Sequence, residues 1–378
     1  MIDWLRINFN EVQPDKALAI RAIRHLKKRE KIKLFSPDIS QMRAAEGRWY
    51  EALVYEMLLD IAKKSDRIGA VVRKGADAPF PPDDILLGQN GLFYSTRGDI
   101  KLRGNGQDLA EFDLLLLDDT GAVAFGEIVT SPSDIKKMEE EILYKKRILG
   151  YLFGQATVPF MLFSSVDISR TTAAKRLMRQ HGSTIIVTRS CEDLKSLLRM
   201  HDTRGIPRKP VRHAKLIDLH AVQPKRPFNY KELHDRRRDR VLEALVKKES
   251  METLKKADDI PPIVKKIIFG ALYPSGIRAL CRETEFSIRD HMYSCNDVLD
   301  HFSKVIIAAD LPGYEPVIYL RLKHKKEYLK MVPTRGGGFK VESKRSVRMK
   351  GFFLWLESVE PTLGANVTTR FVDQFIKQ

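Results

Sequence analysis

The sequence predicts an α/β domain followed by a second, basic α+β domain. Strand-like and helix-like patterns alternate from about residue 44 to residue 199, an order typical of a sheet covered by helices. A cationic segment with four prolines and no sustained apolar periodicity follows at 203–228 and is interpreted as a linker. The chain has 378 residues, which exceeds the roughly 100–200 of one typical domain, so two domains are expected.

The charge of the chain indicates a polyanionic partner. Lys and Arg outnumber Asp and Glu by 66 to 49, a net charge of +17, so the surface must attract polyanions. We expect nucleic acid, with DNA ranked before RNA. The sequence has no uncharged apolar run of membrane-spanning length and no secretory signal pattern. We therefore expect a soluble intracellular protein that does not use a membrane; its oligomeric state stays open, a homodimer included.

The cysteines argue against two classes of small stabilised domain. Cys191, Cys281 and Cys295 are odd in number and show no CxxC spacing. A disulfide framework and a cysteine zinc site are both disfavoured by this pattern.

The N-terminal segment, 1–40, is expected to be basic and helical. A basic amphipathic helix is predicted at Pro14–Ile32. A second helix, Met42–Lys64, carries an apolar stripe at four-residue steps, formed by Trp49, Leu53, Met57 and Ile61. A short strand at Ile68–Val72 follows, and then a long Gly-, Pro- and Asp-rich connection, Gly75–Gly106, with one strand at Leu92–Ser95.

The central part of the α/β domain reads as a hairpin and two helix-strand repeats. Strands are predicted at Ala110–Leu117 and Ala122–Val129, and Asp118–Gly121 between them has hairpin chemistry. Ser133 can cap the next helix. The remaining predicted elements are strand Val158–Ser164, helix Thr171–His181, strand Thr184–Thr188 and helix Cys191–Arg199.

The second domain, 229–378, is predicted as helices followed by a small antiparallel sheet. Prolines interrupt the helical patterns of Asn229–Asp300. The predicted strands are Pro316–Leu322, Tyr328–Val332, Phe339–Glu342 and Gly351–Leu356, with a last helix at Val367–Ile376.

Two acids stand inside otherwise apolar strands of the α/β domain. Asp113 and Glu127 belong to the run EFDLLLLDDTGAVAFGEIVTS, and ionised carboxylates buried there are costly without a partner. A tight hairpin brings them to neighbouring strands, where they repel unless a cation lies between them. A hard divalent ion with oxygen ligands, Mg²⁺ or Mn²⁺, would relieve the repulsion.

This pattern resembles the metal motif of the PD-(D/E)XK nucleases: an acid on one strand, a turn, and a second acid followed two places later by a functional residue. The helix with EGRWYEALVYEMLL is similar to the first helix of that fold. The resemblance covers about residues 44–199 and implies a restriction-endonuclease-like core within a domain at 41–202. It also implies that Glu51, which follows Gly47, completes the metal shell; Glu46 and Glu56 are the alternatives.

One position departs from the family pattern. Val129 stands where the family usually has a lysine that orients the attacking water and neutralises developing charge. In some members this cation comes from the following helix, and here Lys136 and Lys137 lie in its first turn. Lys145, Lys146 and Arg147 are further along. The alternative is a nuclease scaffold that has lost catalysis.

Basic clusters recur along the chain. Each one alone is typical of a solvated face, but with the net charge they favour phosphate binding. They are Arg24–Lys33, Arg204–Lys215, Arg236–Arg240, Lys323–Lys330 and Lys340–Lys350.

The sequence thus leads to one functional hypothesis and two alternatives. The hypothesis is a metal-dependent endonuclease that hydrolyses phosphodiester bonds, expected in DNA, with a C-terminal domain that grips the substrate. Asp113, Glu127 and Glu51 would ligate metal, and Lys136 or Lys137 would replace the missing lysine. The alternatives are a nuclease-fold protein that only binds nucleic acid, and a basic structural or assembly protein.

Overall fold

The computed structural model describes residues 2–12, 14–79, 88–257, 263–275, 278, 286–288, 291–293, 295–311, 313–324, 328–336, 339–341 and 355. The chain forms two compact units. Unit 1 comprises Met1–Asp84, Gly91–Arg103 and Ala110–Phe228, and unit 2 comprises Ile85–Asn90, Gly104–Leu109 and Asn229–Gln378. Most of the strand expected at 351–356 and all of the helix expected at 367–376 lie outside the described residues.

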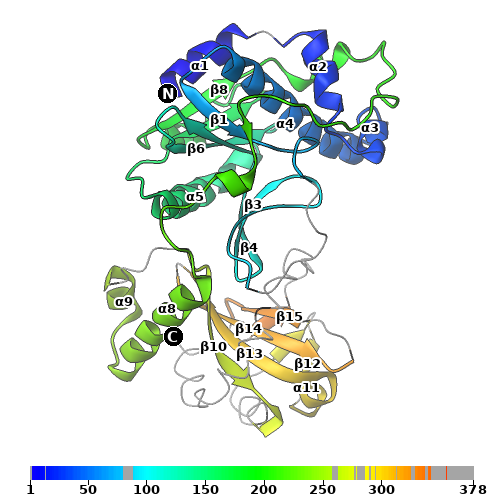
Figure 1. The fold of residues 1–378 in the computed structure, drawn as a ribbon. Helices are drawn as coiled ribbons and strands as arrows, with labels where there is room; N and C mark the ends of the chain where they lie inside the picture. Colours follow the sequence, from blue (N-terminus) through cyan, green and yellow to red (C-terminus); the bar gives the residue numbers. More distant parts are fainter. Residues whose placement is uncertain are drawn as a thin grey trace. The chain divides into compact units, whose positions relative to one another are not determined.

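Unit 1 contains a mixed six-stranded sheet in the order β8-β7-β6-β5-β1-β9. Figure 1 labels β1, β6 and β8 of this sheet together with the helices α4 and α5. Its strands are β1 (Ile68–Val72), β5 (Leu114–Asp118), β6 (Val123–Val129), β7 (Phe160–Ser164), β8 (Ser183–Val187) and β9 (Leu216–Ile217). The neighbours β1, β5 and β6 are antiparallel, whereas β6, β7 and β8 are parallel. Parallel neighbours need crossover connections, and α5 and α6 provide them. The expected α/β architecture, a mixed sheet flanked by helices, is confirmed.

The helices of unit 1 follow the sequence patterns closely. They are α1 (Ile2–Glu11), α2 (Lys16–Ile23), α3 (Lys28–Lys33), α4 (Ile39–Lys63), η1 (Asp134–Lys137), α5 (Met138–Phe153), α6 (Thr172–Met178), α7 (Cys191–Ser196) and η2 (Leu219–Ala221). The helix expected over 14–32 is in fact two, α2 and α3, separated by a turn. Helix α4 begins at the N-cap Asp38, whose carboxylate accepts from Ser40 N and Gln41 N.

The sheet has a different layer on each face. Trp49, Leu53 and other α4 residues form one core with Ala124 of β6, and Ile128 packs against that core. Because side chains alternate along a strand, Phe125, Glu127 and Val129 point to the opposite face. Helix α5 lies on that face, because Lys145 of α5 contacts Glu127. Glu127 therefore points toward α5 rather than toward α4.

The structure corrects the strand predicted at 110–117. The chain there forms two strands, β4 (Gln107–Phe112) and β5, which belong to different sheets. Strand β4 belongs to a separate three-stranded sheet with β2 (Gly91–Tyr94) and β3 (Ile100–Gly104). The change of sheet falls at Asp113, whose backbone carbonyl accepts from Lys74 Nζ at 2.7 Å instead of joining a strand ladder.

The segment interpreted as a linker, 203–228, contributes to the sheet of unit 1. Its strand β9 pairs in parallel with β1, Val71 opposite Leu216. The sequence did not indicate this strand for two reasons. The segment 203–228 has few apolar residues, and a strand of two residues is too short to show alternation.

Unit 2 combines helices with a mostly antiparallel sheet of seven strands in the order β10-β13-β14-β15-β16-β11-β12. Its elements are α8 (Tyr230–Val246), α9 (Met251–Ala257), β10 (Lys266–Leu272), β11 (Phe286–Ile288), β12 (His291–Tyr293), α11 (Cys295–His301), β13 (Phe302–Asp310), β14 (Glu315–Leu322), β15 (Tyr328–Pro333) and β16 (Phe339–Val341). The prediction of helices throughout 229–300 is wrong for β10, β11 and β12. Strand β10 pairs with a strand that is distant in sequence, Lys266 with Asp310. Strands β11 and β12 pair with each other, and β11 also joins the distant β16.

No helix within the described ranges is long and apolar enough to cross a membrane.

A buried ionic network fastens the N-terminal helices to unit 1. Arg24 at the end of α2 binds both oxygens of Asp77, at 2.6 and 2.8 Å, and Glu56 of α4 at 2.7 Å. His25 Nε2 lies 2.9 Å from the same Glu56 carboxylate, and Tyr55 donates to Asp77 at 3.1 Å. The network fixes α2, α4 and the loop after β1 relative to one another.

We predict that Asp77→Ala strongly destabilises unit 1. The substitution leaves the buried Arg24 guanidinium without its bidentate partner, and breaking such a pair costs about 3–5 kcal/mol. Chemical denaturation measures the free energy of unfolding. Asp66→Ala is the matched control, because Asp66 is fully exposed and lies 3.8 Å from Lys215. Equal stability of the two variants would contradict a structural role for the network.

Candidate functional site

The central feature of the site is a buried carboxylate on β6. Glu127 is only 6% exposed. Its Oε2 lies 2.8 Å from Nζ of Lys145, which projects from α5 and is 2% exposed. The same Nζ lies 3.0 Å from Oε1 of Glu141, one turn earlier on α5. A lysine from the helix thus reaches the acid of the strand.

Asp113 stands beside Glu127 at the point where the chain changes sheets. Its Oδ2 accepts a hydrogen bond from the backbone N–H of Ile128 at 2.8 Å. This bond ties Asp113 to the residue directly after Glu127, so Asp113, in the bend between β4 and β5, lies next to β6. The second oxygen, Oδ1, lies 3.9 Å from Lys74 Nζ.

Glu51 joins the same group from α4. Its Oε2 lies 3.2 Å from Lys74 Nζ and 3.2 Å from Arg48. Because Lys74 also binds the carbonyl of Asp113, this lysine links Glu51 to the strand acids.

The two alternative helix acids lie elsewhere. Glu46 pairs with Lys195 at 3.1 Å. Glu56 belongs to the network of Arg24 and His25, and its hydrogen bond to His25 and the charge of Arg24 lower its pKa to about 2, against the opposing effect of burial. Of the three acids considered on α4, Glu51 is the one beside Asp113.

Burial and mutual repulsion act on the glutamates of the site. Burial raises the pKa of Glu127 to about 8, and the charge of Asp113 acts in the same direction while Lys145 opposes it. Burial also raises the pKa of Glu51, again with a contribution from Asp113 and against Lys74. The acidic neighbours Glu127 and Glu141 in turn raise the pKa of Lys145 and keep it charged. The lysines of the site therefore compensate the negative charge of its carboxylates only in part.

The free carboxylate oxygens fit a cation. Glu127 Oε1 is buried and has no hydrogen-bond partner among the described residues, and Asp113 Oδ1 has only the distant Lys74. Such oxygens are the ligands that hard divalent ions prefer. Within the described ranges, no group of three or more His, Cys, Asp or Glu side chains is arranged to hold a metal ion. A cation here would be held by two strand carboxylates, with Glu51 nearby.

The structure places a lysine at the acids, but it is Lys145. Lys136 and Lys137 lie in η1, before α5, and their side chains fall outside the described part of the structure. Val129, in the family's lysine position, is a buried core residue.

One sequence signal could have singled out Lys145. It occupies the buried stripe of α5 that also contains Ile142, Leu149 and Leu152, and a lysine at a core position needs a charged partner. Lys74 gave no comparable signal, since it follows a strand in an irregular segment.

We predict that Glu127→Gln changes the pH dependence of stability in chelator-treated protein. The folded-state pKa of Glu127 is raised from 4.5 to about 8, so folding binds a proton between these values. The wild type should therefore lose stability as pH rises from about 4.5 to 8, relative to the glutamine variant. Denaturation midpoints across this range measure the difference. Glu141→Gln, which removes an exposed partner of the same lysine, should keep the wild-type profile; parallel profiles for Glu127→Gln and wild type would refute the assignment.

Comparison with known proteins supplies no family for this chain. No family model, no curated protein and no solved structure matches it. The function is therefore argued from the geometry and the electrostatics of the site.

Proposed function

We propose that this chain is a metal-dependent nuclease that hydrolyses phosphodiester bonds, with DNA as the first substrate to test and Mg²⁺ or Mn²⁺ as the cofactor. The observation that carries the proposal is the environment of Glu127. One oxygen of this buried carboxylate binds a helix lysine, the other has no hydrogen-bond partner among the described residues, and the charge of Asp113 acts on the same carboxylate. An acid pair can hold a divalent ion, and a lysine beside it can stabilise the charge that develops on a phosphate, which are two contributions to metal-assisted phosphodiester hydrolysis.

The order of elements around the site supports a restriction-endonuclease-like core. Helix α4 is followed by the antiparallel strands β1, β5 and β6, and then by α5 and the parallel strand β7. The two acids lie at the start of β5 and on β6, and Glu51 lies on the first helix of this series. These are the positions that the PD-(D/E)XK resemblance implies for metal-binding residues.

The residues of the site divide the chemistry among them. Asp113 and Glu127 would hold the divalent ion, with Glu51 close enough to assist through a water. A bound ion would lower the pKa of a water and stabilise negative charge on the phosphate. Lys145 is held by Glu127 and Glu141, so its ammonium group is fixed beside the acids, where it can orient the attacking water and neutralise developing charge. It would replace the lysine missing at Val129.

A specific observation also favours a binding-only protein. Lys74 and Lys145 are already ion-paired with the site acids, and such pairs can compensate buried carboxylates without a metal. In that case the α/β core would be a scaffold for nucleic-acid binding.

We predict that wild-type protein cleaves DNA or RNA with Mg²⁺ or Mn²⁺ and that Asp113→Asn abolishes cleavage. Lys145→Met should lower the rate about 10²- to 10³-fold, because one preorganised donor is lost. Single-turnover cleavage of labelled oligonucleotides measures both rates. Lys146→Met is the control, since this neighbouring lysine contacts Ser183 and the carbonyl of His181 instead.

The fold of each variant must be checked in the same experiment. Circular dichroism will show whether Lys145→Met remains folded, and Lys145→Arg keeps the charge if it does not. No cleavage by wild type with either ion would exclude the nuclease proposal and leave the binding-only candidate.

We also predict that Mg²⁺ or Mn²⁺ raises the melting temperature of wild type, because an ion that binds only the folded state stabilises it. At about 100 times the dissociation constant the gain is about 2.7 kcal/mol. Asp113→Asn should lose the shift, whereas Glu46→Gln, which alters an acid of the same helix as Glu51 that pairs with Lys195, should retain it. An identical shift in wild type and Asp113→Asn would place the ion elsewhere.

A further inference from the structure

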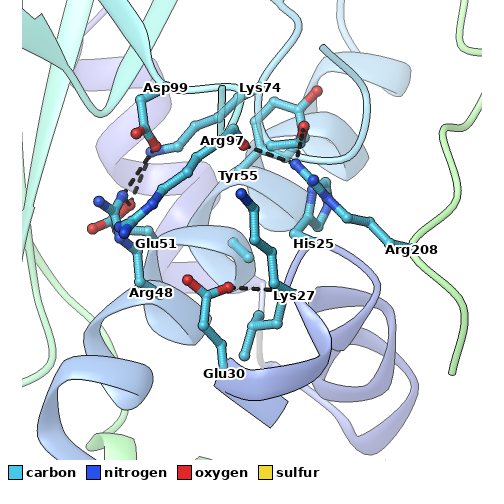
Figure 2. A pocket seen from close by; sticks show the side chains of 13 residues that line it. His25, Lys27, Glu30, Arg48, Glu51, Tyr55, Lys74, Arg97, Asp99 and Arg208 are labelled. Carbon is cyan, nitrogen blue, oxygen red and sulfur yellow. Dashed lines mark hydrogen bonds and ion pairs between the residues drawn. The ribbon is translucent and has the colours of Figure 1, made fainter. Parts of the chain in front are cut away.

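A cationic pocket in unit 1 has Glu51, one of the acids of the site, in its lining (Figure 2). Glu51 and Lys74 form the wall that the two share. The other side is built from the turn between α2 and α3, which carries Lys27, and from two distant segments that carry Arg97 and Arg208. The pocket therefore gathers residues from five separate segments of the chain.

The charges around the pocket do not cancel. Arg48 and Lys74 are matched by Glu51 and Asp99, through contacts of 3.0 to 3.2 Å. Lys27, Arg97 and Arg208 then face a single remaining acid, Glu30, whose Oε2 accepts from the backbone N–H of Lys27 at 2.7 Å. In the described part of the chain, the side chains of Lys27 and Arg97 make no ion pair. The unbalanced positive charge points to an anionic ligand.

Arg208 is held in place before any ligand arrives. Its Nη2 donates to the backbone carbonyls of Gly75 and Arg97, at 3.0 and 2.8 Å. Its Nε is buried and has no hydrogen-bond partner among the described residues. A guanidinium fixed in this way loses little conformational entropy when it binds a phosphate.

The loop that presents Arg97 is also fixed. Gly98 adopts a φ of +86°, and a Cβ at this position would lie 2.4 Å from the carbonyl oxygen of Gly75. Only glycine permits this close approach. The backbone of Arg97 and the carbonyl that orients Arg208 thus have defined positions.

The positive charge of Arg208 also acts on a neighbouring lysine, Lys31. Lys31 of α3 is buried, its Nζ donates to the carbonyl of Ile206, and burial together with the charge of Arg208 lowers its pKa. An anion in the pocket would relieve this repulsion.

We infer that this pocket binds a phosphate group of the nucleic-acid strand, adjacent to the phosphate that lies at Asp113 and Glu127. The inference rests on the proposed function and deepens it, because it assigns a second phosphate position to the same site. Phosphate is the anion that matches a planar guanidinium and a nearby ammonium group. The group is either an internal phosphodiester or a terminal monoester, and the choice between them determines whether cleavage depends on a strand end.

Inorganic phosphate tests the pocket without any catalysis. In chelator, at constant ionic strength maintained with chloride, phosphate should raise the melting temperature of wild type. Lys27→Ala combined with Arg97→Ala should abolish the shift. Lys28→Ala combined with Arg67→Ala is the matched control; both residues are exposed and outside the pocket, and the shift should persist. No shift in wild type, or an equal shift in the pocket variant, would overturn the inference.

Oligonucleotides then identify the source of the phosphate. Strands of one sequence with a 5′-phosphate, a 3′-phosphate or neither are bound in chelator, and their affinities are compared by fluorescence anisotropy. A terminal ligand predicts about tenfold tighter binding of one phosphorylated strand, by wild type only. An internal ligand predicts equal binding of all three and an equal loss in the pocket variant, with a salt slope smaller by about one.

These outcomes separate the two proposals. If the protein binds phosphate through the pocket but never cleaves, the inference about the pocket stands and the nuclease proposal fails. If the wild type cleaves with Mg²⁺ or Mn²⁺ and the pocket variant binds and cleaves equally well, the nuclease proposal stands and the inference about the pocket fails.

Discussion

The burial of Glu127 next to Asp113 is the constraint on which the arrangement of the site depends. Strand β6 lies inside the sheet, so its carboxylate is removed from water, and a buried charge requires a partner. Lys145 supplies one, and it can do so only because α5 crosses the face of the sheet toward which Glu127 points. One carboxylate oxygen has no hydrogen-bond partner within the described part of the chain. This incomplete compensation distinguishes the site from an ordinary internal ion pair.

The loop after β1 connects the site to the rest of unit 1. Lys74 binds Glu51 and the carbonyl of Asp113, Gly75 forms part of the cationic pocket, and Asp77 receives the bidentate contact of Arg24. Three residues within the short segment 74–77 therefore join the acids, the pocket and the buried network of the N-terminal helices. Because Arg24 also contacts the carbonyl of Lys209, the segment that presents Arg208 is attached to the same loop.

Local patterns in the sequence predicted much of unit 1 but less of unit 2. The apolar stripe of α4, the bounds of β1 and the hairpin between β5 and β6 follow from side-chain periodicity and turn chemistry. The break at Asp113 was missed because Ala110–Leu117 is apolar except at Glu111 and Asp113 and resembles one strand, and only the pairing of β4 and β5 with different sheets separates them. Strand β10 was missed for a related reason, since its partner β13 lies about 40 residues away and strand pairing at that distance leaves no local signal.

The sequence by itself determined the alternation of helices and strands in the core of unit 1, the excess of positive charge, and the two acids placed among apolar residues. Only the tertiary structure showed that Lys145 of α5 contacts Glu127. It also decided which glutamate of α4 lies near Asp113: Glu51, which shares Lys74 with it, rather than Glu46 or Glu56. It also decided that Lys27, Arg97 and Arg208 share one pocket. The physical reason is that residue type and spacing specify the face of one element, whereas a charge-charge contact depends on how separate elements pack.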